Sequence, residues 1–438
     1  MSPTLSSLLS IALVGRVLDD YRGVILVSAL VLFGPPSGHL IYGQFPAIIK
    51  GEAGIPQREW VKEYGPVVRA VGPLGIERLI FMKPDALHKI LVSDWVDYPR
   101  PGFMRHILGL IAGYGLLTVT GNEHKQMRKF INPAFSIPGL VALPETDMYY
   151  DPIESLIKIM QTHIDSEKSP DVGKEFLMYE WMSKVTLDII CETAFGYRTD
   201  SLHDPHNDLA EAYEKLISMQ TGPNLARFIA IMVIPGVPQL LASDWAYRHR
   251  HWFALSQTLA RIATLIESMH RIKQISATIL AEKMQASVAI SDTDTKRDVM
   301  SLLVHARKAD PEKDKGYAMS DEVMMDQVLT FLGAGHETTA SGLAWTLWLL
   351  ANDQESQARL REEVTPLLSE NPRPDYRSLK DLQWLDCVVM ESLRVLPPVP
   401  MTFRSAAKTD YIDGVLVPKG TILYIPVCLL PHVTPIAS

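Results

Sequence analysis

The segment 333–339, GAGHETT, places two glycines, a histidine, a glutamate and two threonines in the middle of an apolar stretch. It is not a zinc-protease HExxH motif, because the second histidine is absent. In a helix, the Thr338 hydroxyl can compete for the carbonyl of Ala334, which its own amide also bonds. Gly335 would leave space beside that carbonyl and Glu337 would add a carboxylate, which predicts a groove with a proton relay for a small bound ligand. The alternative is a helix that packs small polar residues against a neighbour.

Two further pairs have a spacing that could support a function. Glu391 and Arg394 lie three residues apart, and the residues around them are mainly apolar, so we expect a buried ion pair on one helix face. A buried pair needs additional partners, and Arg404 is a nearby charge in the sequence. His124 and Arg128 lie four residues apart in a basic segment, which taken alone indicates a solvated face of a helix.

The element that must position the first segment is a long helix over residues 321–353. Apolar residues recur across it at helical spacing, and no proline interrupts it. Ser320 is a suitable N-cap, and Asp321 and Glu322 would complement the positive end of the helix dipole. We therefore expect the rest of the chain to be organised around this helix.

Helical patterns also dominate elsewhere, including 149–197, 245–284, 354–364 and 379–396. Residues 64–82 and 401–427 instead have strand-like patterns, the second with an Asp-Gly turn at 413–414. Residues 99–120 contain four glycines and are expected to form a mostly apolar loop. The predicted fold class is therefore mainly α, with a minor β-sheet subdomain to which both ends of the chain contribute.

Composition excludes several classes of protein. A net charge of −8 without a long Lys/Arg run argues against a nucleic-acid binder. Three cysteines without paired spacing exclude a disulfide framework and a CxxC metal site. Residues 1–33 contain two short apolar runs, each shorter than the ~20 residues of a spanning helix. They form a candidate membrane anchor, with a cleaved signal peptide or a buried segment as alternatives, before a single domain over 34–438.

Five segments together carry a resemblance to a known family. They are 115–129 (GLLTVTGNEHKQMRK), 186–197 (TLDIICETAFGY), 334–339 (AGHETT), 391–394 (ESLR) and 403–421 (FRSAAKTDYIDGVLVPKGT). In this order they resemble the cytochrome P-450 superfamily of heme-thiolate monooxygenases, in its eukaryotic, fungal, membrane-bound form. The resemblance runs from the proline hinge at 34–36 to residue 421.

The resemblance implies a role for each matching residue. Ala334, Gly335, Glu337 and Thr338 match the dioxygen groove of the family, in which the glutamate and the threonine deliver protons. Glu391 and Arg394 match a pair that locks the core. The residues that match heme-propionate ligands are His124, Arg128 and Arg404, and the apolar stretches 99–117 and 221–241 match substrate-pocket and access loops.

The chain departs from the family pattern in one respect. Family members continue into a loop of the type FxxGxRxCxG, whose cysteine is the axial iron ligand, and then into a last helix. Neither occurs in this sequence. Cys428 and His432 are poor substitutes, because the glycine-rich loop around them is absent. We therefore expect an incomplete heme domain without a protein metal ligand, and no thiolate ligation.

The family resemblance also implies an activity. It implies a heme b enzyme that oxidises an apolar small molecule with dioxygen, receives electrons from an NADPH-dependent flavoprotein reductase and serves secondary metabolism. It also implies contact with a membrane surface, with an endoplasmic reticulum location and a cytosolic catalytic domain. Two interpretations stay open: a truncated version of such a monooxygenase, or an inactive pseudo-enzyme that binds apolar ligands.

Overall fold

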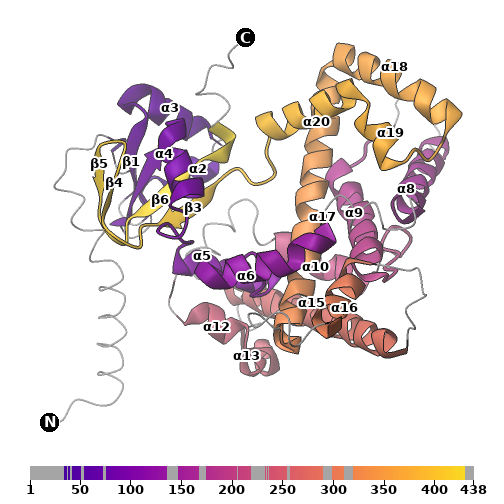
Figure 1. Cartoon of the computed structure of the whole chain (residues 1–438), viewed down its shortest axis with the longest axis horizontal. Coiled ribbons are helices and arrows are strands. Elements are labelled where there is room, and N and C mark those ends of the chain that lie inside the picture. The colour runs from indigo at the N-terminus through magenta and orange to yellow at the C-terminus, as the bar shows by residue number, and fades with distance from the viewer. Residues whose placement is uncertain are drawn as a thin grey trace. The chain divides into compact units, whose positions relative to one another are not determined.

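The computed structural model describes residues 34–36, 38–39, 42–50, 54–72, 75–135, 147–166, 174–204, 206–218, 232, 234, 236–253, 257–289, 298–309 and 319–429 (Figure 1). They belong to two compact units. The sheet unit comprises the described residues within 1–107, 220–240 and 399–438, and the helical unit those within 108–219 and 241–398. Two helices cross from one unit to the other: α5 (Gly102–Ala112) and α12 (Val237–Leu241).

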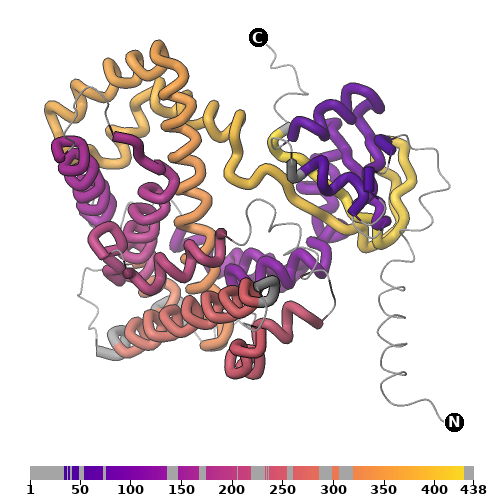
Figure 2. The backbone as a smooth tube through the Cα atoms, turned by 180° about the vertical axis from the view of Figure 1, so that it is seen from behind, coloured from indigo at the N-terminus to yellow at the C-terminus, as the bar shows by residue number. Residues whose placement is uncertain are grey.

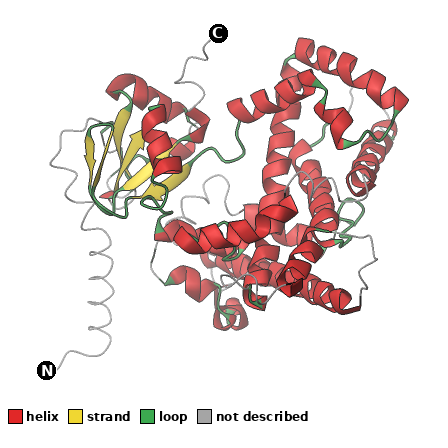
Figure 3. Cartoon of the chain, viewed as in Figure 1, coloured by secondary structure: helices red, strands yellow, loops and turns green. Residues whose placement is uncertain are grey.

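The strands of the sheet unit are drawn in yellow in Figure 3. Four of them form one sheet in the order β1-β2-β6-β3. Its strands are β1 (Val67–Val71), β2 (Glu77–Phe81), β3 (Thr402–Ser405) and β6 (Ile422–Ile425). β2 pairs with β1 antiparallel and with β6 parallel, and β3 pairs with β6 antiparallel. The prediction that both ends of the chain contribute to a minor sheet is confirmed.

A second hairpin joins β4 (Asp410–Ile412) to β5 (Val415–Val417). Its turn has positive φ at both Asp413 (49°) and Gly414 (77°), the conformation that two-residue hairpin loops require and that an Asp-Gly pair supplies. The turn predicted at 413–414 is therefore confirmed.

The four-stranded sheet is buried on both faces. Successive residues of β2 alternate between two apolar clusters, with Leu79 and Phe81 in one and Ile80 in the other. Three helices and a π-helical turn accompany the strands: α2 (Phe45–Lys50), α3 (Ile55–Tyr64), α4 (Pro84–His88) and the turn Lys89–Ser93. Trp60 of α3 packs in the second cluster and Ile90 in the first.

The helical unit is built around α17 (Asp321–Asn352). Its other helices are α6 (Gly121–Ile131), α8 (Asp147–Asp165), α9 (Met178–Phe195), α10 (Asp208–Ser218), α13 (Asp244–Arg248), α14 (Arg250–Phe253), α15 (Gln257–Ala289), α16 (Val299–Ala309), α18 (Gln354–Glu370), α19 (Tyr376–Lys380) and α20 (Gln383–Val395). α9, α15, α18 and α20 pack directly against α17, which passes through this unit in both views (Figures 1 and 2).

The predicted central helix is confirmed almost to the residue. The Ser320 side chain caps it by accepting a hydrogen bond from the Val323 amide at 3.2 Å. It ends at Asn352, one residue before the predicted end, because Asp353 caps the next helix by accepting from the Ser356 amide at 3.0 Å. The helix is continuous through its glycines and threonines.

Two predictions about elements were wrong. The segment 99–120 is not a loop throughout, because Gly102–Ala112 forms α5. Its apolar residues Phe103, Ile107 and Leu110 recur at helical spacing, and this pattern outweighs the glycines. The long helix expected at 245–284 starts only at Gln257, after the short helices α13 and α14.

Parts of the membrane and access predictions lie outside the described residues, namely the candidate anchor at 1–33 and residues 221–231, 233 and 235 of the expected access loop. Within the part of the chain that the structure describes, none of the helices combines the length and the apolar character that crossing a bilayer requires.

Candidate functional site

The threonines at the centre of α17 bond the helix's own backbone. Thr338 Oγ1 donates to the Ala334 carbonyl at 2.8 Å, and Thr339 Oγ1 donates to the Gly335 carbonyl at the same distance. This confirms the predicted competition of the Thr338 hydroxyl for the Ala334 carbonyl. Both threonines lie on an exposed face of the helix, so each hydroxyl oxygen keeps its lone pairs available to another group.

Gly335 packs against a neighbouring helix, as the alternative interpretation of this segment predicts. A Cβ atom at this position would lie 2.7 Å from Cγ1 of Ile190 on α9, closer than real side chains approach. The glycine therefore lets α9 lie against α17. The packing alternative therefore holds for the face that meets α9, whereas the hydroxyls are exposed on another face, where the proton relay stays a prediction.

The Glu337 carboxylate is held by side chains that face it from α9 and from its own helix. The Tyr179 hydroxyl donates to Oε2 at 2.5 Å, and the Ser183 hydroxyl donates to Oε1 at 3.4 Å. His336 Nε2 lies 2.9 Å from Oε1, although not in the alignment of a hydrogen bond. Burial raises the pKa of Glu337, but its contacts with His336, Tyr179 and Ser183 outweigh burial and lower that pKa overall. The carboxylate is therefore ionised at neutral pH.

His336 is fully buried and its ring is fixed in orientation. Its Nδ1 bonds the Leu332 carbonyl at 2.8 Å, and its ring meets the edge of Tyr213 with 4.5 Å between the ring centroids. Its backbone carbonyl accepts a hydrogen bond from the Thr186 hydroxyl at 3.1 Å. Tyr179 and Ser183 could not be predicted as partners of Glu337, because they are about 150 residues away in the sequence and belong to no motif.

The expectation that Glu391 and Arg394 form a buried pair was half wrong. They form a two-point ion pair, with Arg394 Nε and Nη2 at 2.7 and 2.6 Å from the two oxygens of Glu391. The side chains are, however, 59% exposed for Glu391 and 30% for Arg394. Neighbouring apolar residues such as Met390 and Leu393 are exposed as well, so in the described chain this face of α20 is not covered.

Arg404 is part of an arginine pair in the sheet unit. Its guanidinium donates to Thr402 Oγ1 at 3.0 Å and to the Phe403 carbonyl at 2.8 Å. Burial lowers the pKa of Arg404, and repulsion from the nearby Arg100 lowers it further, to about 10. Burial also lowers the pKa of Arg100. Arg100 was not among the predicted site residues, and the Arg-Pro sequence at 100–101 is only a weak signal for it.

This arginine pair fits an anionic group with two carboxylates. Two guanidinium groups that are partly buried and repel each other are strongly stabilised by a bound anion, because the anion pairs with both positive charges. The other predicted ligands of this kind, His124 and Arg128, belong to α6 of the helical unit. Arg128 is exposed there, and the basic face on which it lies is the expected solvated one.

The three cysteines are poorly suited to bind iron as thiolates. Burial raises the pKa of Cys428, which packs with Trp60 and Tyr424 in the core of the sheet unit. Burial also raises the pKa of Cys191, whereas Cys387 is exposed. Among the described residues, no three His, Cys, Asp or Glu side chains form a metal-binding group. His432 lies outside the described residues.

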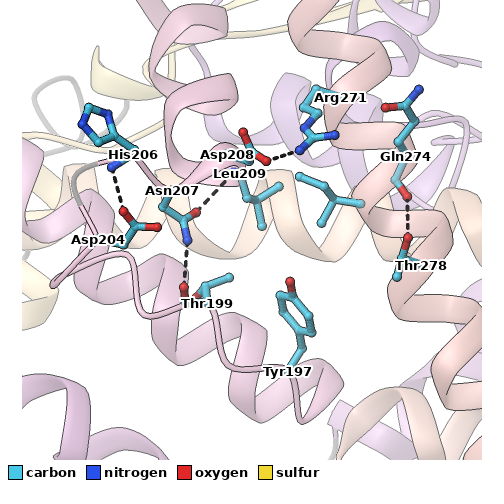
Figure 4. A pocket seen from close by; sticks show the side chains of 11 residues that line it. Tyr197, Thr199, Asp204, His206, Asn207, Asp208, Leu209, Arg271, Gln274 and Thr278 are labelled. Carbon is cyan, nitrogen blue, oxygen red and sulfur yellow. Dashed lines mark hydrogen bonds and ion pairs between the residues drawn. The ribbon is translucent and has the colours of Figure 1, made fainter.

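A polar hollow of about 410 Å³ lies between α10, α15 and the segment after α9 (Figure 4). Its polar side chains bond one another or the backbone: Arg271 pairs with Asp208, Asn207 donates to the Thr199 carbonyl at 2.7 Å, and Thr278 donates to the Gln274 carbonyl at 3.2 Å. The predicted catalytic residues do not line it. We therefore do not identify it as the functional site.

Comparisons with known proteins agree on one family. Residues 33–433 match the family described as Cytochrome P450. Cytochrome P450 monooxygenase 205 of Postia placenta is 31% identical over 416 residues, which cover 91% of this chain and 72% of that protein. Cytochrome P450 monooxygenase sphH of Aspergillus fumigatus is 29% identical, covering 91% of this chain and 69% of that protein.

The fold is also that of a solved structure. The crystal structure of the cytochrome P450DA heme domain matches with a TM-score of 0.69 at 18% identity, covering 92% of this chain and 78% of that one. The predicted fold class, mainly helical with small sheets, is confirmed. The chain therefore belongs to the cytochrome P450 family of heme-containing monooxygenases.

Proposed function

We propose that this protein inserts one oxygen atom from dioxygen into an apolar small molecule, with heme b as cofactor. Electrons would come from an NADPH-dependent flavoprotein reductase. The observation that carries the proposal is the hydrogen bond from the Thr338 hydroxyl to the Ala334 carbonyl, beside the ionised Glu337, in the middle of α17. Family membership supports a redox partner and a small-molecule substrate in general terms.

The protein would contribute binding, orientation and proton supply. When bound, the heme supplies the activation of dioxygen and the oxidation of substrate. Arg100 and Arg404 would hold its carboxylates, because guanidinium groups bind carboxylates in a bidentate manner, and the roles of His124 and Arg128 stay predictions from the family resemblance. The Thr338 hydroxyl donates its hydrogen to the Ala334 carbonyl; to pass a proton on, it would rotate away from that carbonyl and accept another proton on its oxygen. Glu337 would be the carboxylate that takes up and releases these protons.

Replacing Thr338 by alanine should therefore uncouple electron use from product formation. In the enzyme completed with the family's cysteine loop, loaded with heme and supplied with the reductase and NADPH, we expect several-fold more NADPH consumed per product, because general acid–base groups contribute large factors to proton-dependent steps. Thr339→Ala is the matched control, since Thr339 makes the same type of backbone bond at 2.8 Å one residue further along the helix. Equal coupling in Thr338→Ala and in the unchanged chain would contradict the proton-relay role.

The finer aspects of location belong to the same proposal. We infer a membrane surface at the endoplasmic reticulum, with the catalytic domain in the cytosol and the apolar segment 1–33 as the anchor. A role in secondary metabolism, which the family resemblance implies, is part of the same proposal. Co-sedimentation with microsomes, lost when residues 1–33 are deleted, would test the anchor.

A second candidate function is favoured by the cysteines. A chain that holds heme or an apolar ligand without a thiolate would be a pseudo-enzyme, and burial keeps the thiols of Cys191 and Cys428 protonated. To separate the two functions, the purified chain is loaded with heme, reduced and exposed to carbon monoxide. We expect no thiolate-type Soret band from these cysteines. A thiolate-type band would overturn that expectation and favour the monooxygenase.

A further inference from the structure

The Glu337 carboxylate has two differently placed oxygens. Oε1 faces His336, which is fully buried, and Ser183. Oε2 accepts a hydrogen bond at 2.5 Å from Tyr179, a residue that is 37% exposed at the start of α9. We propose that Tyr179 is the group through which Glu337 takes up protons from solvent; this inference deepens the proposed function and rests on the relay role of Glu337 in it.

The surroundings of Oε1 make it the poorer route. The His336 ring is held by the Leu332 carbonyl on one side and packed against the edge of Tyr213, which is itself buried. The Ser183 hydroxyl lies 3.4 Å away, a long hydrogen bond. Oε1 therefore faces groups that fix the carboxylate, whereas Oε2 faces the residue with access to water.

The proton transfer balances without any other reactant. As the Tyr179 O–H bond breaks, its proton passes to Glu337 Oε2, and the phenol oxygen takes a proton from a hydronium ion of the solvent, which is left as water. The net change is one proton moved from solvent to the carboxylate, with the tyrosine regenerated. Burial, and then the hydrogen bond to Glu337, raise the pKa of Tyr179, so the phenol keeps its proton at neutral pH and can act as the donor.

The titratable groups that face Glu337 come from three helices of the helical unit. Tyr179 faces it from α9, and His336 lies beside it on α17. Tyr213 of α10 senses it more weakly: burial raises the pKa of Tyr213 most, and the charge of Glu337 adds to that effect. Of these groups, Tyr179 makes the shortest contact with the carboxylate and is not buried. Substituting Tyr179 should therefore change the pKa of Glu337 without disturbing the buried residues around it.

The first test measures the protonation of Glu337 in the full chain without heme. Infrared difference spectra across a pH titration, with Glu337→Gln to identify the band, report the pKa of this carboxyl. We expect that pKa to be below the ordinary value of about 4.3, and to rise by about one unit in Tyr179→Phe because a hydrogen bond to the charged form is lost. Tyr150→Phe is the matched control, since its hydroxyl bonds the Pro374 carbonyl at 2.8 Å and not Glu337.

The second test measures the rate of proton uptake after a rapid drop in pH, followed at the same infrared band. Tyr179→Phe should slow this uptake several-fold, and Tyr150→Phe should not. An unchanged Glu337 pKa in Tyr179→Phe, or a shifted pKa with an unchanged rate of uptake, would overturn the proposal.

Tyr179→Phe keeps the aromatic ring, and thermal unfolding checks that the variant is folded. Ser183→Ala loses only the long bond to Oε1, so it should shift the pKa of Glu337 less than Tyr179→Phe does. Because neither test needs heme or turnover, their failure is distinguishable from failure of the Thr338→Ala coupling experiment.

Discussion

Replacing Arg404 by glutamine is expected to weaken heme binding by about tenfold to a hundredfold, while the heme-free protein becomes no less stable. A hydrogen bond to a charged group contributes about 1.5–3 kcal/mol, which corresponds to that range of affinity. In the heme-free protein the same side chain is repelled by Arg100 and partly dehydrated. Opposite effects on ligand binding and on stability are the mark of a residue kept for binding rather than for folding.

The pH dependence has a definite sign. The folded-state pKa of Arg404 is lowered to about 10, so between that pH and the ordinary arginine pKa the unfolded chain binds more protons. Stability of the heme-free protein should therefore rise with pH in that window, and this rise should be smaller in Arg404→Gln.

Heme titration followed by Soret absorbance measures the affinity, and thermal or urea unfolding measures the stability. Arg198→Gln is the control, because Arg198 is exposed and pairs with Glu192 in the helical unit. Unchanged heme affinity in Arg404→Gln, or the same loss in Arg198→Gln, would show that the arginine pair is not the binding site for the heme carboxylates.

Replacing Asp188 by alanine should destabilise the protein by about 3 kcal/mol. Asp188 lies on α9, is 8% exposed, and accepts hydrogen bonds from the chain that follows the helix: Thr199 Oγ1 at 2.6 Å, the Ser201 amide at 2.8 Å and the Leu202 amide at 3.3 Å. Removing the carboxylate leaves two backbone donors without this acceptor, and a buried unsatisfied donor costs about 1–3 kcal/mol.

Asp188→Asn separates this explanation from a general effect of substitution. The Thr199 and Ser201 bonds share Oδ1, which an asparagine keeps, and only the longer Leu202 bond uses Oδ2. The expected loss is therefore about 1 kcal/mol. Urea unfolding gives both free energies, with equal slopes indicating that the folded structure is retained. Equal losses for alanine and asparagine would contradict the hydrogen-bonding explanation.

Sequence reasoning was most successful where the interaction is local. The Ser320 cap, the Asp-Gly turn at 413–414 and the bond from Thr338 to the Ala334 carbonyl all join atoms within four residues of each other. Their geometry follows from backbone conformation and side-chain chemistry alone, so a pattern of residue types suffices to predict them. The strand-like periodicity at both ends of the chain similarly predicted one shared sheet.

It failed where burial depends on which surfaces meet. Apolar neighbours suggested that Glu391 and Arg394 are buried, yet the pair is exposed because this face of α20 is not covered in the described chain. Gly335 was assigned to a groove, and only the approach of Ile190 explains why no side chain fits there. Arg100 gains significance only through its nearness to Arg404, about 300 residues away.

The sequence by itself determined the central helix, its hydroxyl-to-carbonyl bond and the family to which the chain belongs. Only the tertiary structure decided what surrounds the carboxylate in that helix. Glu337 meets Tyr179 and Ser183 because α9 packs against α17 where Gly335 allows close contact, and the charge of a carboxylate depends on such neighbours rather than on its own segment. The partners that set the protonation of Glu337 are therefore a property of helix packing.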